Sequence, residues 1–212
     1  MENKDKIILD LCGGTGSWSM PYKLAGYDVR IITLPDYDVR TYEPPENVHG
    51  ILCAPPCTEF SVLNCIAEAR QRDEDAGMEI VNACKRIVKQ CIENNKIKPK
   101  FWAMENPVGH LRKYLGKPKM SFQPWEFGDP WTKRTDIWGL YNVPEKKYKN
   151  WDDVPKLPLY IRPNRGKPNF AYLHKSAWKD IPQLSYHEPK TDAEFRAMTP
   201  PAFAKAFFEA NQ

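Results

Sequence analysis

Three short segments of the chain carry residues that could do chemistry together. Cys57 lies in APPCTEFS, Glu105 and Asn106 lie in MENP, and Lys133 and Arg134 lie in TKRTD. A thiolate can add to an electron-poor ring when an acid and a cation neutralise the charge that develops on that ring. A thiol, a carboxyl group and a basic pair therefore suit covalent catalysis on such a ring.

Other chemistries fit these segments less well. The histidines of the chain lie outside them, which disfavours a cysteine–histidine protease. His49, Cys53, Cys57 and Cys65 have the spacing H-x3-C-x3-C-x7-C, which matches no paired zinc-ligand pattern, so no metal site is predicted. On position alone, Cys57 is equally consistent with a small, inert packing residue, because free cysteines are usually buried.

Each of the three segments adjoins a predicted strand. The apolar runs Ile51–Ala54 and FWAMENP both stop at proline, and short apolar runs are typical of strands in the middle of a parallel sheet. Proline cannot donate a ladder hydrogen bond, so Cys57 and Glu105 lie where strands end. A further strand is predicted over Thr132–Tyr141, with the basic pair at its start. Open α/β sheets bind ligands at the edge where strands end.

The chain opens with a βαβ pattern. Strand Ile7–Leu11 is followed by the loop DLCGGTGSW, which would aim backbone N–H groups at a ligand. This loop is not G-x-G-x-x-G and no Walker lysine follows, so a phosphate cradle is not predicted, and tight packing is the alternative role of its glycines. The other predicted elements are a helix over Ser17–Ala25, a strand over Tyr27–Leu34, an amphipathic helix over Glu74–Asn95 and a closing helix over Pro200–Asn211. The segment between Pro35 and Val48 is too short for a full crossover helix.

Length and composition indicate one reduced, cytoplasmic domain. A chain of 212 residues can form one substantial core. Met1–Lys6 is charged and no apolar run follows it, so we expect no signal peptide. The longest apolar runs are too short to cross a bilayer. We expect the six cysteines to remain thiols.

The segment 141–190 is irregular and rich in proline. Within Tyr141–Asp180 there are nine Lys or Arg residues, four Asp or Glu residues and seven aromatic residues. Together with a net charge of +4, this composition permits nucleic acid as a partner. Interleaved basic and aromatic side chains suit stacking on unpaired bases. A surface loop packed by prolines and aromatic residues would have the same composition.

Five motifs, taken in order, resemble those of DNA cytosine-C5 methyltransferases. They are LDLCGGTGSW, APPCTEFS, MENPVG, FGDPWTKRTDIWG and FRAMTPPAFAKAFFEAN. They resemble, in the same order, the family's cofactor loop, its Pro-Cys nucleophile loop, its Glu-Asn strand end, its arginine-bearing strand and its final helix. The resemblance spans most of the chain and suggests a compact, phage-type version. It implies a Rossmann-like class I S-adenosylmethionine-dependent methyltransferase fold, α/β, with a mostly parallel sheet, helices on both faces and a single domain over 1–212.

The resemblance also implies roles for individual residues. Cys57 would be the thiolate that adds to C6 of cytosine, Glu105 would hold N3 and the exocyclic amine, and Arg134 would steady the charge near O2 or the flanking phosphate. The implied cofactor-binding residues are Asp10, Leu11, Cys12, Gly13, Gly14, Gly16, Trp18, Asp38, Pro56 and Arg196. The implied nucleic-acid-binding residues are Ser61, Asn106, Lys133, Arg162 and Arg165. The implied partner is DNA, double- or single-stranded, without a metal or a membrane.

The chain departs from the family pattern in its cofactor loop and in its size. The helix and acidic residue that follow the second strand in the family are missing around Leu34–Asp36, where Asp36 would have to substitute. Cys12 stands in place of an aromatic residue, and Asp136 in place of an arginine. The large target-recognition domain is absent, so the segment 141–190 would have to hold the nucleic acid.

These departures leave several hypotheses for the activity beside methylation of DNA cytosine. The missing recognition domain is consistent with RNA cytosine or a free nucleotide as substrate, and Asp136 with a catalytically silent nucleic-acid-binding homologue. Arg196 stands where the family has an asparagine near the transferable methyl group. A guanidinium there would attract an anionic substituent, which gives carboxymethyl transfer from carboxy-S-adenosylmethionine as a further hypothesis. An ion pair of Arg196 with Glu194 or Asp192, or a contact with the DNA backbone, is the alternative.

Overall fold

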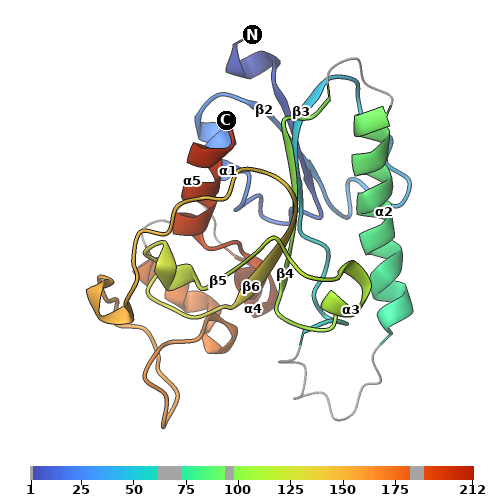
Figure 1. Cartoon of the computed structure of the whole chain (residues 1–212). Coiled ribbons are helices and arrows are strands. Elements are labelled where there is room, and N and C mark those ends of the chain that lie inside the picture. Colours follow the sequence, from blue (N-terminus) through green and yellow to red (C-terminus); the bar gives the residue numbers. More distant parts are fainter. Residues whose placement is uncertain (1, 62–72, 94–97, 182–188) are drawn as a thin grey trace.

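The computed structural model describes residues 2–61, 73–93, 98–181 and 189–212, and its centre is a six-stranded sheet (Figure 1). The strands are β1 (Ile7–Leu11), β2 (Asp28–Ile32), β3 (Val48–Cys53), β4 (Phe101–Pro107), β5 (Met120–Phe122) and β6 (Thr135–Leu140). Their order across the sheet is β2-β1-β3-β4-β6-β5. The first four strands in this order are parallel, whereas β6 runs antiparallel to both β4 and β5.

The direction of β6 brings its first residues to the edge where β3 and β4 end. In the β4–β6 ladder, Asn106 pairs with Asp136 and Pro107 pairs with Thr135. The residues that precede β6 therefore lie beside the carboxyl end of β4. Lys133 is one of them, so the three chemistry-bearing segments meet at one edge of the sheet, as predicted.

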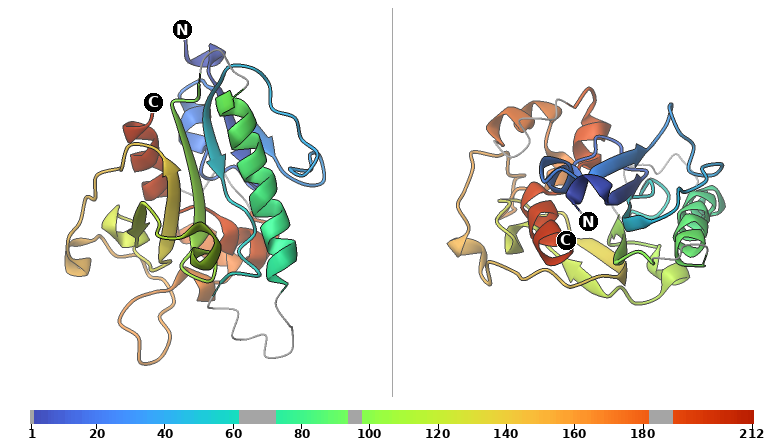
Figure 2. Two further views of the ribbon diagram at one scale, coloured as in Figure 1. Left: turned by 45° about the vertical axis from the view of Figure 1, so that its right-hand side comes forward. Right: turned by 90° about the horizontal axis from the view of Figure 1, so that it is seen from above.

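Helices cover both faces of this sheet. They are α1 (Met20–Leu24), α2 (Glu74–Glu93), α3 (Arg112–Leu115), α4 (Asp192–Ala197) and α5 (Pro201–Ala210). Helices α2 and α3 lie on one side, and α1 and α5 lie together on the other (Figures 1 and 2). The predicted α/β architecture with helices on both faces is confirmed.

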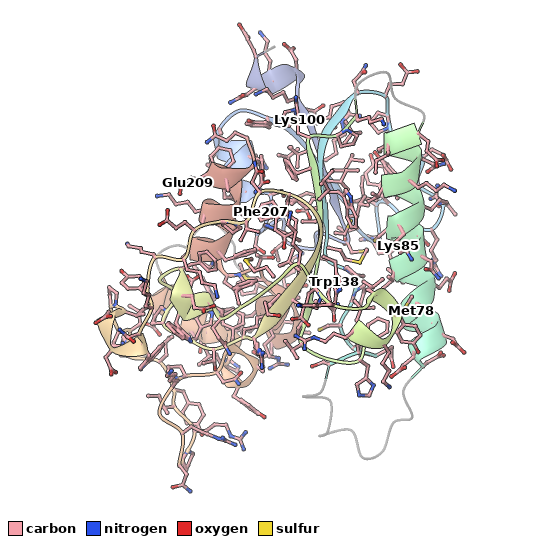
Figure 3. The ribbon with its side chains drawn as sticks, viewed as in Figure 1. Met78, Lys85, Lys100, Trp138, Phe207 and Glu209 are labelled. Carbon is pink, nitrogen blue, oxygen red and sulfur yellow. The ribbon has the colours of Figure 1, made fainter. Side chains whose placement is uncertain are left out.

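Both faces of the sheet are buried, because successive side chains of a strand point to opposite faces. Ile51 and Cys53 of β3 belong to the core under α2, whereas Leu52 belongs to the core under α5. Figure 3 shows Phe207 on the side of α5 that faces the sheet, and Glu209 on its outer side. Burial on both faces explains why these strands appear in the sequence as continuous apolar runs.

The chain between β6 and α4 is irregular but packed. It contains the short 3-10 helices η4 (Trp151–Asp153), η5 (Phe170–Tyr172) and η6 (Lys175–Asp180), and two more, η1 (Asn3–Asp5) and η3 (Pro124–Glu126), lie earlier. A third apolar core holds Trp131, Phe170 and Phe195, all at most 1% exposed. The described part of the segment 141–190 therefore packs in a core that it shares with Trp131 and with Phe195 of α4; residues 182–188 of that segment lie outside the described residues.

Two elements begin three residues later than predicted, because loops take over their ends, and the second strand and the last helix are shorter than predicted, at Asp28–Ile32 and Pro201–Ala210. The first helix begins at Met20 rather than at Ser17, since Gly14 and Gly16, with φ of 53° and 71°, continue the turn. Strand β6 begins at Thr135 rather than at Thr132, since the N–H of Thr132 donates to the carbonyl of Pro168 at 2.9 Å instead of to a strand.

Other elements were missed or lie partly outside the described chain. Strand β5 and helix α4 were not predicted, because each is too short for a periodic apolar pattern. Helix α2 begins at Glu74 as predicted, while Asn95, its predicted end, is outside the described residues. None of the helices described is long and apolar enough to span a bilayer.

A buried ion pair ties α3 to the antiparallel part of the sheet. The guanidinium of Arg112 donates to both carboxylate oxygens of Asp136, each at 2.6 Å, and Ser121 Oγ donates to the same carboxylate at 2.5 Å. The Asp136 side chain is 0% exposed and that of Arg112 is 39% exposed. The carboxylate of Asp136 is therefore neutralised by a neighbour within the fold. The resembling family has an arginine at this position.

We expect Arg112→Ala to lower the free energy of unfolding by about 3 kcal/mol, because it leaves a buried carboxylate without its cation. The double variant Arg112→Ala/Asp136→Asn should recover most of this loss, since no charge then remains buried. Urea unfolding followed by circular dichroism measures both. The control is Arg30→Ala, which breaks the exposed pair with Asp28 and should cost less than about 1 kcal/mol. Equal losses for Arg112→Ala and Arg30→Ala would contradict the role given to the buried pair.

Candidate active site

A cavity of about 570 Å³ lies at the edge where β1, β3 and β4 end. Its volume is within the range of small-molecule sites, about 300–1,000 Å³. Its lining comes from the glycine-rich loop after β1, the Pro-Cys loop after β3, the end of β4, the residue Lys133 before β6, and helix α4 with its flanks. Segments from the beginning, the middle and the end of the chain thus share one cavity.

The glycine-rich loop closes tightly over Asp10. A Cβ atom on Gly13 would lie 2.4–2.7 Å from the Asp10 carboxylate, so only glycine fits there. Ser19 Oγ donates to Asp10 Oδ2 at 2.6 Å, while no described residue bonds Oδ1, which is buried. Burial raises the pKa of Asp10 to about 6, against the opposing effect of the Ser19 hydrogen bond. The cavity therefore contains a carboxylate with an unused acceptor.

Trp18 and Cys12 line the same cavity from the loop. Trp18 packs edge-on against Phe207 with ring centroids 5.4 Å apart, and its buried Nε1 has no hydrogen-bond partner within the described chain. The Cys12 thiol faces the Cys84 thiol of α2, and this hydrogen bond together with burial raises the pKa of Cys12. The sulfur of Cys12 is thus part of the core as well as of the cavity wall.

Three predicted cofactor residues do not line the cavity. Leu11 is fully buried in the core under α2. Gly16 lies against Ile31, whose Cδ1 would be 2.6 Å from an added Cβ. The carboxylate of Asp38 accepts from the Arg40 guanidinium at 2.6–3.0 Å, which lowers the pKa of Asp38. Pro56, Gly14 and Arg196, by contrast, are in the lining.

The Pro-Cys loop is held by a buried amide. Asn106 Nδ2 donates to the carbonyl of Pro55 at 3.0 Å, and the Asn106 side chain is fully buried. The N–H groups of Phe60 and Ser61 then donate to the carbonyl of Cys57 at 3.1 and 2.9 Å, which closes a turn. Asn106 therefore positions Cys57, and its burial speaks against the direct nucleic-acid contact that the sequence suggested.

Cys57 and Glu105 face the same cation. Burial raises the pKa of Cys57, while the nearby charge of Lys133 acts in the opposite direction. Burial also raises the pKa of Glu105, and Lys133 again opposes the shift. Lys133 Nζ is fixed by donating to the carbonyl of Met198 at 2.9 Å. A thiol, a carboxyl group with a raised pKa and an ammonium group are thereby assembled.

The cation inside the cavity is Lys133 and not Arg134. The side chain of Arg134 is exposed and absent from the lining, although its backbone carbonyl accepts from the N–H of Val108 at 3.0 Å. The sequence assigned the catalytic position to Arg134 and the nucleic-acid contact to Lys133. Adjacent side chains point in opposite directions in extended chain, so Lys133 and not Arg134 lines the cavity.

Helix α4 and its flanks complete the lining of the cavity. Thr191 caps it by accepting from the N–H of Glu194 at 3.1 Å, and the Glu194 carboxylate accepts from the N–H of Lys190 at 2.6 Å. Arg196 reaches the lining but forms no hydrogen bond or ion pair with any described residue. The expected alternative, a pairing of Arg196 with Glu194 or Asp192, is thus not observed.

Sequence reasoning placed Arg196 in the site but missed the other lining residues of the α4 region. Lys190, Glu194 and Thr199 line the cavity, and the N–H of Thr199 donates to Ser17 Oγ at 2.8 Å. A signal was present, because Thr191 followed three residues later by Glu194 is a capping pattern that predicts a helix start. Of the predicted nucleic-acid residues, Ser61 bridges to Gly109 beside the site, and Arg162 and Arg165 line a second cavity.

The residues present fit S-adenosylmethionine. Asp10 offers a buried acceptor and Trp18 a buried donor, both without partners among the described residues. Glu105 adds a second buried carboxyl group that raises the pKa of Asp10, and two such groups favour a ligand that carries positive charge. The close contact of Gly13 with Asp10 keeps the loop free of side chains at this point.

We expect Lys133→Gln to raise the pKa of Cys57, because it removes the cation that favours the thiolate. Alkylation of Cys57 by iodoacetamide should then be severalfold slower at pH 8, with its pH midpoint moved upward. Peptide mass spectrometry follows Cys57 separately from the other thiols. The matched control is Arg134→Gln, which removes a neighbouring charge outside the cavity and should leave the midpoint unchanged. A midpoint that moves equally in both variants would overturn the assignment of the cation.

Comparison with known proteins identifies the fold. No protein-family model and no curated protein matches the chain. Among solved structures it is similar to the methyltransferase EhMeth of Entamoeba histolytica, with a TM-score of 0.53 and 10% sequence identity over 97% of this chain and 97% of that chain. A match to the S. pombe Dnmt2 methyltransferase has a TM-score of 0.40 and 13% identity, over 78% of this chain and 59% of that chain. The chain has the predicted Rossmann-like fold of class I S-adenosylmethionine-dependent methyltransferases.

Proposed function

We propose that this chain transfers a methyl group from S-adenosylmethionine to C5 of cytosine in DNA. The observation that carries the proposal is the convergence of Cys57, Glu105 and Lys133 on one cavity beside the glycine-rich loop. The fold supports it, because open α/β sheets bind ligands at the edge where this cavity lies. EhMeth, the solved structure with a similar fold, is described as a methyltransferase.

In this proposal Cys57 activates the ring. Cytosine C5 is too weakly nucleophilic to attack a methyl sulfonium directly. When the Cys57 thiolate forms a bond to C6, the electrons of the C5–C6 double bond become available at C5 and negative charge develops toward N3. C5 would form its new bond to the methyl carbon as the S–CH3 bond of the cofactor breaks, and the electron pair of that bond would stay on the sulfur, which leaves as a neutral thioether. Transfer of the C5 proton to solvent and cleavage of the S–C6 bond would then restore the aromatic ring and the Cys57 thiolate.

Glu105 and Lys133 balance the charge of this addition. Burial raises the pKa of Glu105, which makes its carboxyl group better able to take up a proton and to donate it toward N3 as the ring becomes more basic. Lys133 favours the Cys57 thiolate before addition. It also remains beside the ring when the thiolate charge has moved onto it.

The glycine-rich loop would hold the cofactor. When bound, S-adenosylmethionine supplies a methyl group on a positively charged sulfur. Asp10 accepts hydrogen bonds and attracts positive charge, Trp18 offers an indole N–H, and Pro56 and Arg196 also line the cavity. Because a target carbon inside a duplex is stacked, the base must be extruded or already unpaired to reach this cavity.

We expect Cys57→Ala to abolish label transfer from radioactive S-adenosylmethionine to cytosine-containing DNA, a loss of more than about 1,000-fold. The wild-type protein should form a covalent complex with DNA that contains 5-fluorocytosine, since fluorine at C5 cannot leave as a proton does. Cys91→Ala, which alters a core thiol of α2, should retain both activities. Label transfer that is unchanged in Cys57→Ala would refute the covalent mechanism.

A substrate panel separates the remaining alternatives. Turnover on RNA or on dCMP, without turnover on single- or double-stranded DNA, would assign the activity to those substrates instead. Cofactor binding seen by calorimetry, together with the absence of any adduct on 5-fluorocytosine DNA, would identify a catalytically silent homologue.

A second candidate activity is carboxymethyl transfer, and Arg196 is the observation that favours it. Arg196 lines the cavity and has no acidic partner in the described chain. A guanidinium–carboxylate bond contributes about 1.5–3 kcal/mol, which corresponds to roughly tenfold or better discrimination between cofactors.

We therefore expect the wild-type protein to prefer carboxy-S-adenosylmethionine when both cofactors compete, and Arg196→Asn to shift the product ratio toward 5-methylcytosine by about tenfold. Mass spectrometry of nucleosides from the treated DNA measures the ratio. A wild-type protein that forms only 5-methylcytosine, or a ratio that Arg196→Asn does not change, would rule this activity out.

A further inference from the structure

A second cavity, of about 420 Å³, lies in the irregular segment between β6 and α4. Its lining includes the rings of Tyr160 and Tyr172 and the cationic side chains of Arg162, Arg165 and Lys167, and it includes no acidic residue. Tyr160 is 59% exposed, so most of its ring is available to a ligand. Aromatic walls with a surplus of positive charge are complementary to a planar ring that carries a phosphate.

The cations of this cavity are held by rings rather than by carboxylates. The guanidinium of Arg162 lies 4.2 Å from the centroid of the Tyr172 ring. Lys167 Nζ lies 5.0 Å and 5.2 Å from the ring centroids of Trp125 and Trp151. Neither these two cations nor Arg165 has an acidic partner among the residues described. A ring positions a cation without neutralising it, so the charge remains available to an anionic ligand.

The walls of the cavity rest on a packed frame. The N–H of Thr132 donates to the carbonyl of Pro168 at 2.9 Å, and the N–H of Phe170 donates back to the carbonyl of Thr132 at 3.0 Å. Phe170 belongs to the apolar core of this segment, where its ring lies 4.6 Å from that of Phe195 in α4. The cavity is thus built between the start of β6 and the segment that packs on it.

The second cavity adjoins the candidate active site along the chain. Thr132 lines the second cavity, and the next residue, Lys133, lines the first. Adjacent Cα atoms are about 3.8 Å apart, so the linings of the two cavities meet at this peptide bond. A strand whose target base enters the first cavity would therefore pass its neighbouring nucleotide over the second.

We propose that the second cavity binds one unpaired nucleotide that adjoins the target cytosine in single-stranded DNA, with the base on Tyr160 and the phosphate beside Arg162 and Arg165. This inference rests on the proposed function and names its substrate form. Stacking on a tyrosine requires a free base face, and in a duplex both faces of a base are already stacked on its neighbours. The cavity therefore selects unpaired over paired DNA.

The test is fluorescence anisotropy with a labelled 12-nucleotide single strand that contains one cytosine, and with its duplex as competitor. Tyr160→Ala should raise the Kd for the single strand about tenfold, the effect of removing one stacking platform. Arg162→Gln/Arg165→Gln should weaken binding by a similar factor and reduce the slope of log Kd against log salt by about 0.7 for each phosphate that is no longer neutralised. All substituted side chains are exposed, so thermal melting should show unchanged folding.

The matched control is Lys85→Gln/Lys89→Gln, which removes two charges from α2 on the opposite side of the sheet (Figure 3). An equal decrease in affinity in this control, or no decrease in the cavity variants, would overturn the proposal. Tighter binding of a duplex or of an RNA strand than of the single-stranded DNA would also overturn it. Binding that depends on the cavity without any methyl transfer would support the cavity and contradict the proposed function alone. Methyl transfer to single-stranded DNA that the cavity variants leave unchanged would support the proposed function and contradict the role of the second cavity alone.

Discussion

The antiparallel pairing of β6 with β4 is the constraint on which the site depends. A parallel strand in this position would bring its end, and not its beginning, to the edge where β3 and β4 stop. The pairing is held by close backbone contact: Gly139 has φ of 132°, and a Cβ there would lie 2.2 Å from the carbonyl oxygen of Trp102. Asp136, bonded to Arg112, anchors the same strand from α3. With β6 fixed in direction and register, Lys133 has one position available to it, beside Cys57 and Glu105.

The charges of the active-site cavity are divided between its floor and its rim. Two carboxyl groups, Asp10 and Glu105, are 0% and 8% exposed and form the floor. Lys190 and Arg196 are exposed and lie at the rim, around α4. A buried acidic floor favours a small cation, while a basic rim favours the phosphates of a polymer or another anion outside. The two ligands of the proposed reaction carry these two signs of charge.

The sequence was sufficient for the architecture and for about half of the residues that line the cavity, because strand ends, prolines and glycines are local signals. It could not decide between Lys133 and Arg134, since a shift of one residue in an extended segment exchanges the directions of the side chains. It also missed that the side-chain amide of Asn106 donates to the Pro55 carbonyl, and that Leu11 faces the core. These facts depend on which neighbour is close in space. Helix α4 joins the site through packing at long sequence separation, which no window of the sequence contains.

The hydrogen bond between Thr199 and Ser17 spans 182 residues and closes the cavity. Tyr22 makes a comparable bond to the carbonyl of Asn211, 189 residues away. On the ribosome, the glycine-rich loop therefore waits until Thr199 has emerged before the last wall of the cavity is in place. A nascent chain that has completed its sheet would still have an open, water-filled site, and ligand affinity would appear abruptly once α4 and Thr199 have packed against the loop. Contacts of such long range also slow folding, so a tightly bound ligand would capture the molecule only after its slowest step.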